Sequence, residues 1–168
     1  MSHHGGAPAH YGSVMEIFGL PAHSALAISV AVLGPVGCLV ALWYSFRPDH
    51  RSFWRWPMLI TAVLATASIF GAYFSGEQLL ADHPELADDP MVVDHQQYAV
   101  RLVLPTVGFF VMASLSALIN PRTGALRVAM PILLAGFSLV VLVLVVLAGD
   151  ADTRSLWETI RDSFDFLN

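Results

Sequence analysis

Four long stretches of the chain contain no charged residue, at residues 24–46, 56–76, 102–120 and 128–149. Each has about the 20 residues that an α-helix needs to cross the roughly 30 Å hydrocarbon core of a bilayer. Because lipid offers the backbone no hydrogen bonds, each span must be helical. The sequence therefore predicts an all-α fold: a polytopic membrane protein with a four-transmembrane-helix bundle.

The composition indicates one membrane domain with a short appendage at each end. Of the 168 residues, 56% are hydrophobic and only 12% are charged, which is too little polar surface for a soluble globule of this size. We predict a flexible extracytoplasmic tail at residues 1–18, the transmembrane domain at 19–149 and an amphipathic segment at 150–168. The net charge of -5 excludes a basic footprint for nucleic acid, so the lipid bilayer is the predicted environment.

Arginines set the predicted orientation in the membrane. Arg47, Arg51 and Arg55 lie between the first two spans, and Arg122 and Arg127 flank the turn between the last two. By the positive-inside rule, both connections face the cytoplasm. Between the second and third spans, residues 82–94 carry only acidic charges: Asp82, Glu85, Asp88, Asp89 and Asp94. We therefore expect a multi-pass protein of the inner (plasma) membrane with both termini outside the cytoplasm.

The segment at 150–168 differs in character from the last span. Its large apolar residues follow helical spacing: Leu156, Trp157, Ile160, Phe164 and Leu167. Charged residues occupy the rest of the helical wheel. This pattern predicts an amphipathic interfacial helix that lies on the outer leaflet or docks on a partner subunit.

Small residues recur every four positions in the second span, at Ala67, Gly71 and Ser75. This spacing lets two helix backbones approach closely, where lipid provides no hydrophobic drive for association. We predict that the second span is the central helix and packs on its neighbours within the chain. A homo-oligomer interface is the alternative.

Histidines and a glutamate collect at the outer ends of the spans. His23 precedes the first span, Glu77 closes the second, His83 lies in the acidic connection and His95 opens the third. Imidazole binds haem iron or a divalent metal, and a nearby carboxylate joins or orients such a site. The sequence thus allows a haem bound by His23 and His95, or a metal ion bound by His23, Glu77 and His95. The favoured interpretation is that these histidines are structural, and cap helices or form hydrogen bonds across loops.

Other polar residues bear on this hypothesis. Arg101 enters the third span soon after the histidine there, and we predict a structural ion pair between Arg101 and Glu77. His3, His4 and His10 lie in the tail, which we expect to be solvated and without a role; loose binding of metal ions there is the alternative.

Short motifs around these positions carry a resemblance to a known family. They are Gly19-Leu20-Pro21-Ala22-His23, Gly76-Glu77, Val93-Asp94-His95 with Tyr98-Ala99, and Gly149-Asp150 followed by Trp157. Their order resembles a family of small four-helix bacterial membrane proteins, common in actinobacteria and defined only as a domain of unknown function. The resemblance covers residues 19–157 and implies a four-helix integral membrane fold without an assigned activity. Family members usually follow the first histidine with proline and place another histidine a few residues later, where this chain has Ser24 and Ile28.

No catalytic machinery is recognisable in the sequence, which lacks the short motifs of hydrolases, nucleotide-binding enzymes and zinc proteases. The first hypothesis is therefore a non-enzymatic integral membrane protein, an accessory or interaction module of a membrane complex with partner subunits. The second is a redox or metal/haem-binding membrane protein that uses the histidines at the outer face.

Overall fold

The computed structural model describes residues 16–17, 20–119 and 123–165. In chain order its elements are β1 (Glu16–Ile17), β2 (Leu20–Pro21), α1 (Ala22–Phe46), η1 (Pro48–His50), α2 (Arg51–Asp82), η2 (Pro84–Leu86), α3 (Pro90–Ile119) and α4 (Leu126–Asp165). The two-residue strands β1 and β2 pair antiparallel immediately before α1. Four long helices thus make up nearly all of the described chain.

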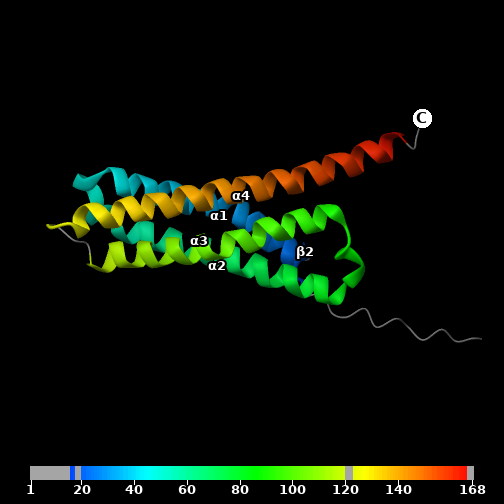
Figure 1. Cartoon of the computed structure of the whole chain (residues 1–168), viewed down its shortest axis with the longest axis horizontal. Helices are drawn as coiled ribbons and strands as arrows, with labels where there is room; N and C mark the ends of the chain where they lie inside the picture. Colours follow the sequence, from blue (N-terminus) through cyan, green and yellow to red (C-terminus); the bar gives the residue numbers. More distant parts are fainter. Residues whose placement is uncertain (1–15, 18–19, 120–122, 166–168) are drawn as a thin grey trace, which may run out of the picture.

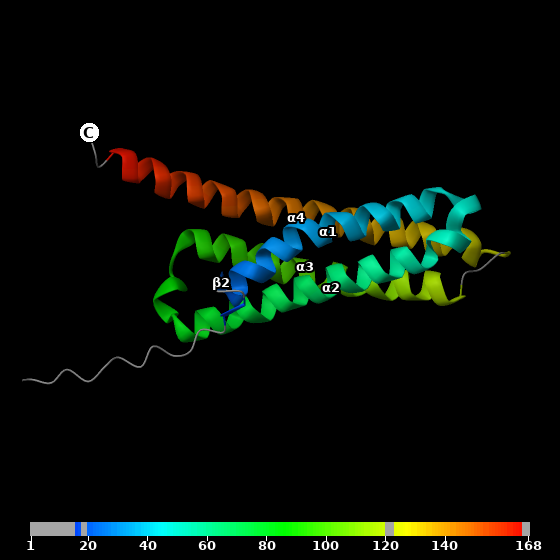
Figure 2. The same cartoon turned by 180° about the vertical axis from the view of Figure 1, so that it is seen from behind.

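The four helices form a bundle in which each helix packs on two neighbours. The packed pairs are α1 with α2, α2 with α3, α3 with α4, and α4 with α1, and the arrangement is visible from both sides in Figures 1 and 2. All four helices are long and apolar enough to cross a membrane. The predicted four-helix membrane bundle is therefore confirmed.

The two ends of the bundle differ in charge. The connection between α2 and α3 lies at the same end as the N-terminal hairpin and the last turns of α4 (Figure 1). This end holds carboxylates such as Glu85 and Asp88, and we call it the acidic end. The other two connections lie at the opposite end, which we call the basic end because it holds Arg47, Arg51 and Arg127.

Apolar side chains face both inward and outward, as expected of a bundle in lipid. Tyr44, Met58 and Phe109 are among the largest fully buried side chains of the core. By contrast, Phe53 and Leu104 are 74% and 78% exposed. Large apolar groups on the outer surface match a hydrocarbon environment, whereas a soluble bundle would place polar residues there.

Small residues let α1 and α2 approach closely. A methyl group added at Gly37 would lie 2.9 Å from Ala65 Cβ and 3.0 Å from the carbonyl oxygen of Thr61. One added at Gly71 would lie 3.2 Å from Leu26 Cδ2 on α1. Gly71 therefore packs within the chain, as predicted. The prediction that the second span is central is wrong, because four helices packed in a ring have no central member.

Helices α2 and α3 begin before the uncharged stretches that predict them. They start at Arg51 and Pro90, whereas the stretches start at residues 56 and 102. The additional turns contain charged residues, which are tolerated where a helix leaves the hydrocarbon core. Arg51 has a structural role there, since its guanidinium donates to the carbonyl oxygens of Tyr44 (3.3 Å) and Ser45 (2.8 Å). Those carbonyls belong to the last turn of α1, where helical partners are missing.

The C-terminal segment is helical, as predicted, and it continues α4 instead of forming a separate element. Helix α4 runs from Leu126 to Asp165, through the predicted boundary at residue 150. Its last turns extend past the other three helices at the acidic end (Figure 1). Most of the tail predicted at residues 1–18 lies outside the described residues, although Glu16 and Ile17 form β1.

Candidate functional site

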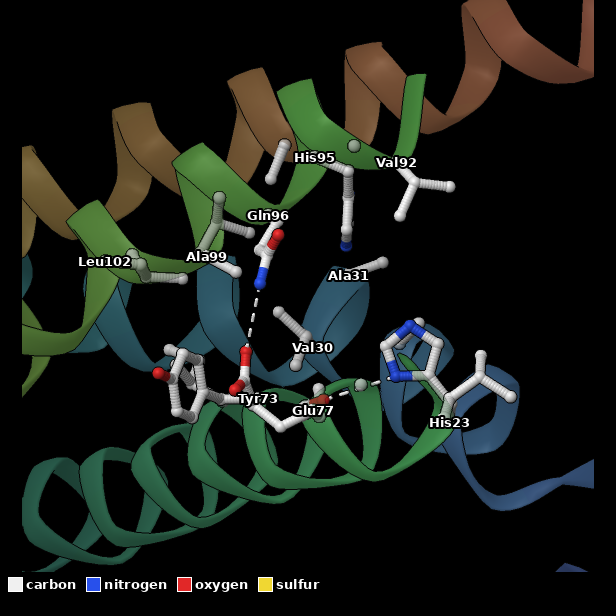
Figure 3. A pocket seen from close by; sticks show the side chains of 18 of the residues that line it. His23, Val30, Ala31, Tyr73, Glu77, Val92, His95, Gln96, Ala99 and Leu102 are labelled. Carbon is white, nitrogen blue, oxygen red and sulfur yellow. Dashed lines mark hydrogen bonds between the residues drawn. The ribbon is translucent and has the colours of Figure 1, made fainter. Parts of the chain in front are cut away.

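A cavity of about 330 Å³ lies at the acidic end of the bundle, between all four helices. Small residues are frequent in its walls: Ala27, Ala31, Ala72, Gly76, Ala99, Ala148 and Gly149. Its polar side chains are His23, Tyr73, Glu77, His95 and Gln96. Figure 3 shows several of them around the cavity. Largely apolar walls with a few convergent polar groups are typical of a small-molecule site.

His23 lies in the first turn of α1 and is anchored to α2. Its Nδ1 atom lies 3.2 Å from the carbonyl oxygen of Ala72 and 3.1 Å from Ser75 Oγ. Because a carbonyl oxygen only accepts hydrogen bonds, we assign the imidazole proton to Nδ1. Gly76 makes room for the ring, since a Cβ there would lie 3.1 Å from His23 Cε1.

His95 faces His23 across the cavity. It comes from α3, which packs on α2 and α4 and lies diagonally opposite α1. The two ring centres are 6.3 Å apart and the ring planes are nearly perpendicular, at 87°. In Figure 3 both side chains point into the space between the helices. The structure thus brings together His23, Glu77 and His95, the three site residues predicted from the sequence, around one cavity.

Glu77 is bound by a residue that the sequence did not single out. Gln96 Nε2 donates to Glu77 Oε1 at 3.3 Å (Figure 3). The predicted ion pair with Arg101 is wrong, because Arg101 donates instead to Gln97 Oε1 at 3.4 Å and its guanidinium lies over the ring of Tyr98. Positions 96 and 101 differ by about 140° around an α-helix, so the two side chains leave α3 in different directions.

The three predicted residues do not form a preassembled metal site. Among the residues whose side chains the structure describes, no group of three or more His, Cys, Asp or Glu has the arrangement that holds a metal ion. A carboxylate bound to Gln96 and two imidazoles therefore share the cavity without converging on one point. The geometry favours a ligand that needs only the two imidazoles.

His83 lies apart from the cavity and belongs to the connection between α2 and α3. Its Nδ1 atom lies 3.0 Å from Glu85 Oε1, and both side chains are exposed. The backbone N–H of Glu85 and the His83 imidazole together lower the pKa of Glu85 below its ordinary value. This pair organises the acidic connection and contributes nothing to the cavity lining.

Sequence reasoning interpreted small residues such as Ala72 and Gly76 as helix contacts and did not predict that they line a cavity. Ala27 and Ala31 are one turn apart on α1, as are Ala72 and Gly76 on α2. The regular spacing is visible in the sequence, but equal spacing also occurs where helices touch, as at Gly37. Only the position of the helices decides whether a small residue closes a contact or opens a space.

No family model, curated protein or solved structure matches the chain.

Proposed function

We propose that this chain is an integral membrane module that binds a small, largely apolar molecule in the cavity at its acidic end. The observation that carries the proposal is a 330 Å³ cavity with apolar walls, in which the imidazoles of His23 and His95 face each other. Few polar groups at fixed positions give orientation and specificity, while apolar walls contribute most of the binding energy. Binding is thus the function that this geometry supports best.

The proposal includes the predicted setting in the membrane. Arginines at the basic end and carboxylates at the acidic end support an inner (plasma) membrane orientation with the acidic end outside the cytoplasm. The cavity then lies near the outer surface, where it is accessible to molecules in the outer leaflet or outside the cell. Membership of the actinobacterial four-helix family is part of the same proposal, supported by the motifs around His23, Glu77 and His95.

The test compares two tryptophan substitutions on α3. Ala99 lines the cavity, whereas Leu104 is 78% exposed on the outer surface. Ala99→Trp fills the cavity, and Leu104→Trp places the same side chain in lipid. The parent and both variants are purified from native membranes in mild detergent, and intact masses are measured under non-denaturing conditions.

We expect one bound molecule per chain in the parent and in Leu104→Trp, and none in Ala99→Trp. Thermal unfolding of each variant establishes that the bundle is intact. Equal amounts of bound molecule in both tryptophan variants, or none in the parent, would count against the cavity as a ligand site.

A second candidate function is an accessory or interaction role, favoured by the extension of α4. Residues 151–165 form a helical arm of about 22 Å beyond the predicted membrane domain. Its amphipathic sequence suits docking on a partner membrane subunit or on a second copy of the chain. If this role is correct, a chain that ends at Asp150 keeps its fold and its bound molecule but no longer co-purifies with the subunits that accompany the full chain.

A further inference from the structure

We propose that the molecule bound at the acidic end is a haem whose iron is held between the imidazoles of His23 and His95. This inference rests on the proposed function and names the chemical class of its ligand. Three observations carry it: the spacing of the two rings, the orientation of His23 and the small residues around both.

The spacing of the two rings suits a shared metal centre. Their centres are 6.3 Å apart, and two imidazoles on opposite sides of one ion, with metal–nitrogen bonds of about 2 Å each, have ring centres about 6 Å apart. The angle of 87° between the ring planes is compatible with this arrangement. Each ring plane contains its own metal–nitrogen bond, so rotation about that bond changes the angle and leaves the spacing unchanged.

His23 has the orientation of a metal ligand. Histidines that bind metals almost always donate their second ring N–H to a carboxylate, a backbone carbonyl or water, which fixes the ring and raises its basicity. Nδ1 of His23 makes this contact with the carbonyl oxygen of Ala72 at 3.2 Å. Nε2 is then the unprotonated nitrogen. Gly76 leaves room for the ring in this position, because a Cβ there would lie 3.1 Å from His23 Cε1 and 3.4 Å from Nδ1.

The number of protein ligands distinguishes haem from a bare metal ion. Structural and catalytic zinc sites use three or four protein ligands, and the described residues contain no such group. A porphyrin supplies four nitrogens itself and needs only axial ligands from the protein. It also needs apolar space between the helices, to which the small residues of the cavity wall contribute: Ala27, Ala31, Ala72, Gly76 and Ala99. Glu77, bound to Gln96, lies at the wall and outside the coordination shell.

The experiment uses the full-length chain with His3, His4 and His10 replaced by glutamine, so that the tail cannot bind haem. The detergent-purified protein is titrated with haem b, and the visible and electron paramagnetic resonance spectra are recorded. We expect one equivalent to bind and to give a low-spin iron with two imidazole ligands. Pulsed electron paramagnetic resonance of protein labelled with ¹⁵N-histidine then shows whether both axial nitrogens come from histidine, without a further substitution at the site.

Substitutions then assign the ligands. His23→Gln and His95→Gln should each raise the Kd for haem by about tenfold or more and abolish the low-spin signal, since even outer-shell substitutions at metal sites have effects of this size. His83→Gln is the matched control, because His83 lies at the same end but outside the cavity. It should bind haem as the parent does.

The outcomes separate the haem assignment from the proposed function. High-spin haem, binding that is equal in all variants, or one equivalent of zinc or copper bound by a chain that takes up no haem would overturn the haem assignment. If the parent binds a different molecule that Ala99→Trp excludes, the cavity keeps its function and the haem assignment fails. If the parent binds no molecule at all, both proposals fail.

Discussion

The phenolic hydroxyl of Tyr44 on α1 donates a hydrogen bond to the backbone carbonyl oxygen of Ser116 on α3, at 3.1 Å and across the diagonal of the bundle. At the acidic end the same two helices bring His23 and His95 together. The diagonal is therefore bridged near both ends. The buried hydrogen bond at the basic end fixes the distance between α1 and α3, and so contributes to the spacing of the two imidazoles.

Replacing this tyrosine tests its contribution to stability. Tyr44→Phe removes the hydroxyl and leaves the ring in place, so we expect a loss of about 0.5–1.5 kcal/mol in the free energy of unfolding. Thermal or denaturant unfolding in detergent measures it. Tyr98→Phe, at a partly exposed position on α3, is the control and should change stability little. Equal effects of the two substitutions would show that the bond to Ser116 contributes nothing.

The four-helix bundle could be predicted from the sequence because the hydrocarbon core excludes charge. The uncharged stretches report where the chain crosses the core, and the described residues of each one lie within a helix of the structure. They do not report where a helix ends, since charged residues such as Arg51 are compatible with helical turns outside the core. For the same reason, α4 continues past Gly149 to Asp165 although the pattern of the sequence changes there.

The candidate site could be predicted only in part. Two spans separate His23 from His95, so the chain returns to the same side of the membrane between them. Their position at the same end of the bundle therefore follows from the sequence alone. Their contact across the diagonal depends on the rotation of α1 and α3 about their own axes, which the sequence does not specify. The same uncertainty explains the wrong ion pair, because Glu77 meets Gln96 and not Arg101 once α3 has its actual rotation.

Close packing of α1 on α2 predicts opposite effects of two glycine substitutions. Gly37→Ala places a methyl group 2.9 Å from Ala65 Cβ and 3.0 Å from a backbone oxygen, so the helices must separate. We expect a loss of about 1–3 kcal/mol. Gly136→Ala meets no atom within 4 Å and should be neutral or stabilise the helix by up to about 1 kcal/mol. Unfolding in detergent compares them. A Gly37→Ala variant as stable as the parent would contradict the close approach.

The acidic connection predicts a pH dependence at Glu85. Its own backbone N–H and the His83 imidazole lower its pKa, so the pair stabilises the connection above the ordinary pKa of glutamate and loses this effect as the pH falls through the lowered value. NMR titration of ¹³C-labelled carboxyl groups should show Glu85 titrating below the usual range. His83→Ala should raise the midpoint only in part, because the backbone N–H is retained. An unchanged midpoint would exclude a contribution from His83.

The orientation in the membrane predicts which end of the bundle is accessible from outside the cell. Ser52 lies at the basic end and Asp88 at the acidic end, and both are exposed. The native Cys38 is fully buried and gives little background. With an impermeant maleimide on intact cells, Asp88→Cys should be labelled and Ser52→Cys should not, because the proposed orientation places the arginine-rich connections in the cytoplasm. Both variants should be labelled after permeabilisation, which establishes that each cysteine is reactive. Labelling of Ser52→Cys alone on intact cells would reverse the orientation and place the cavity on the cytoplasmic side.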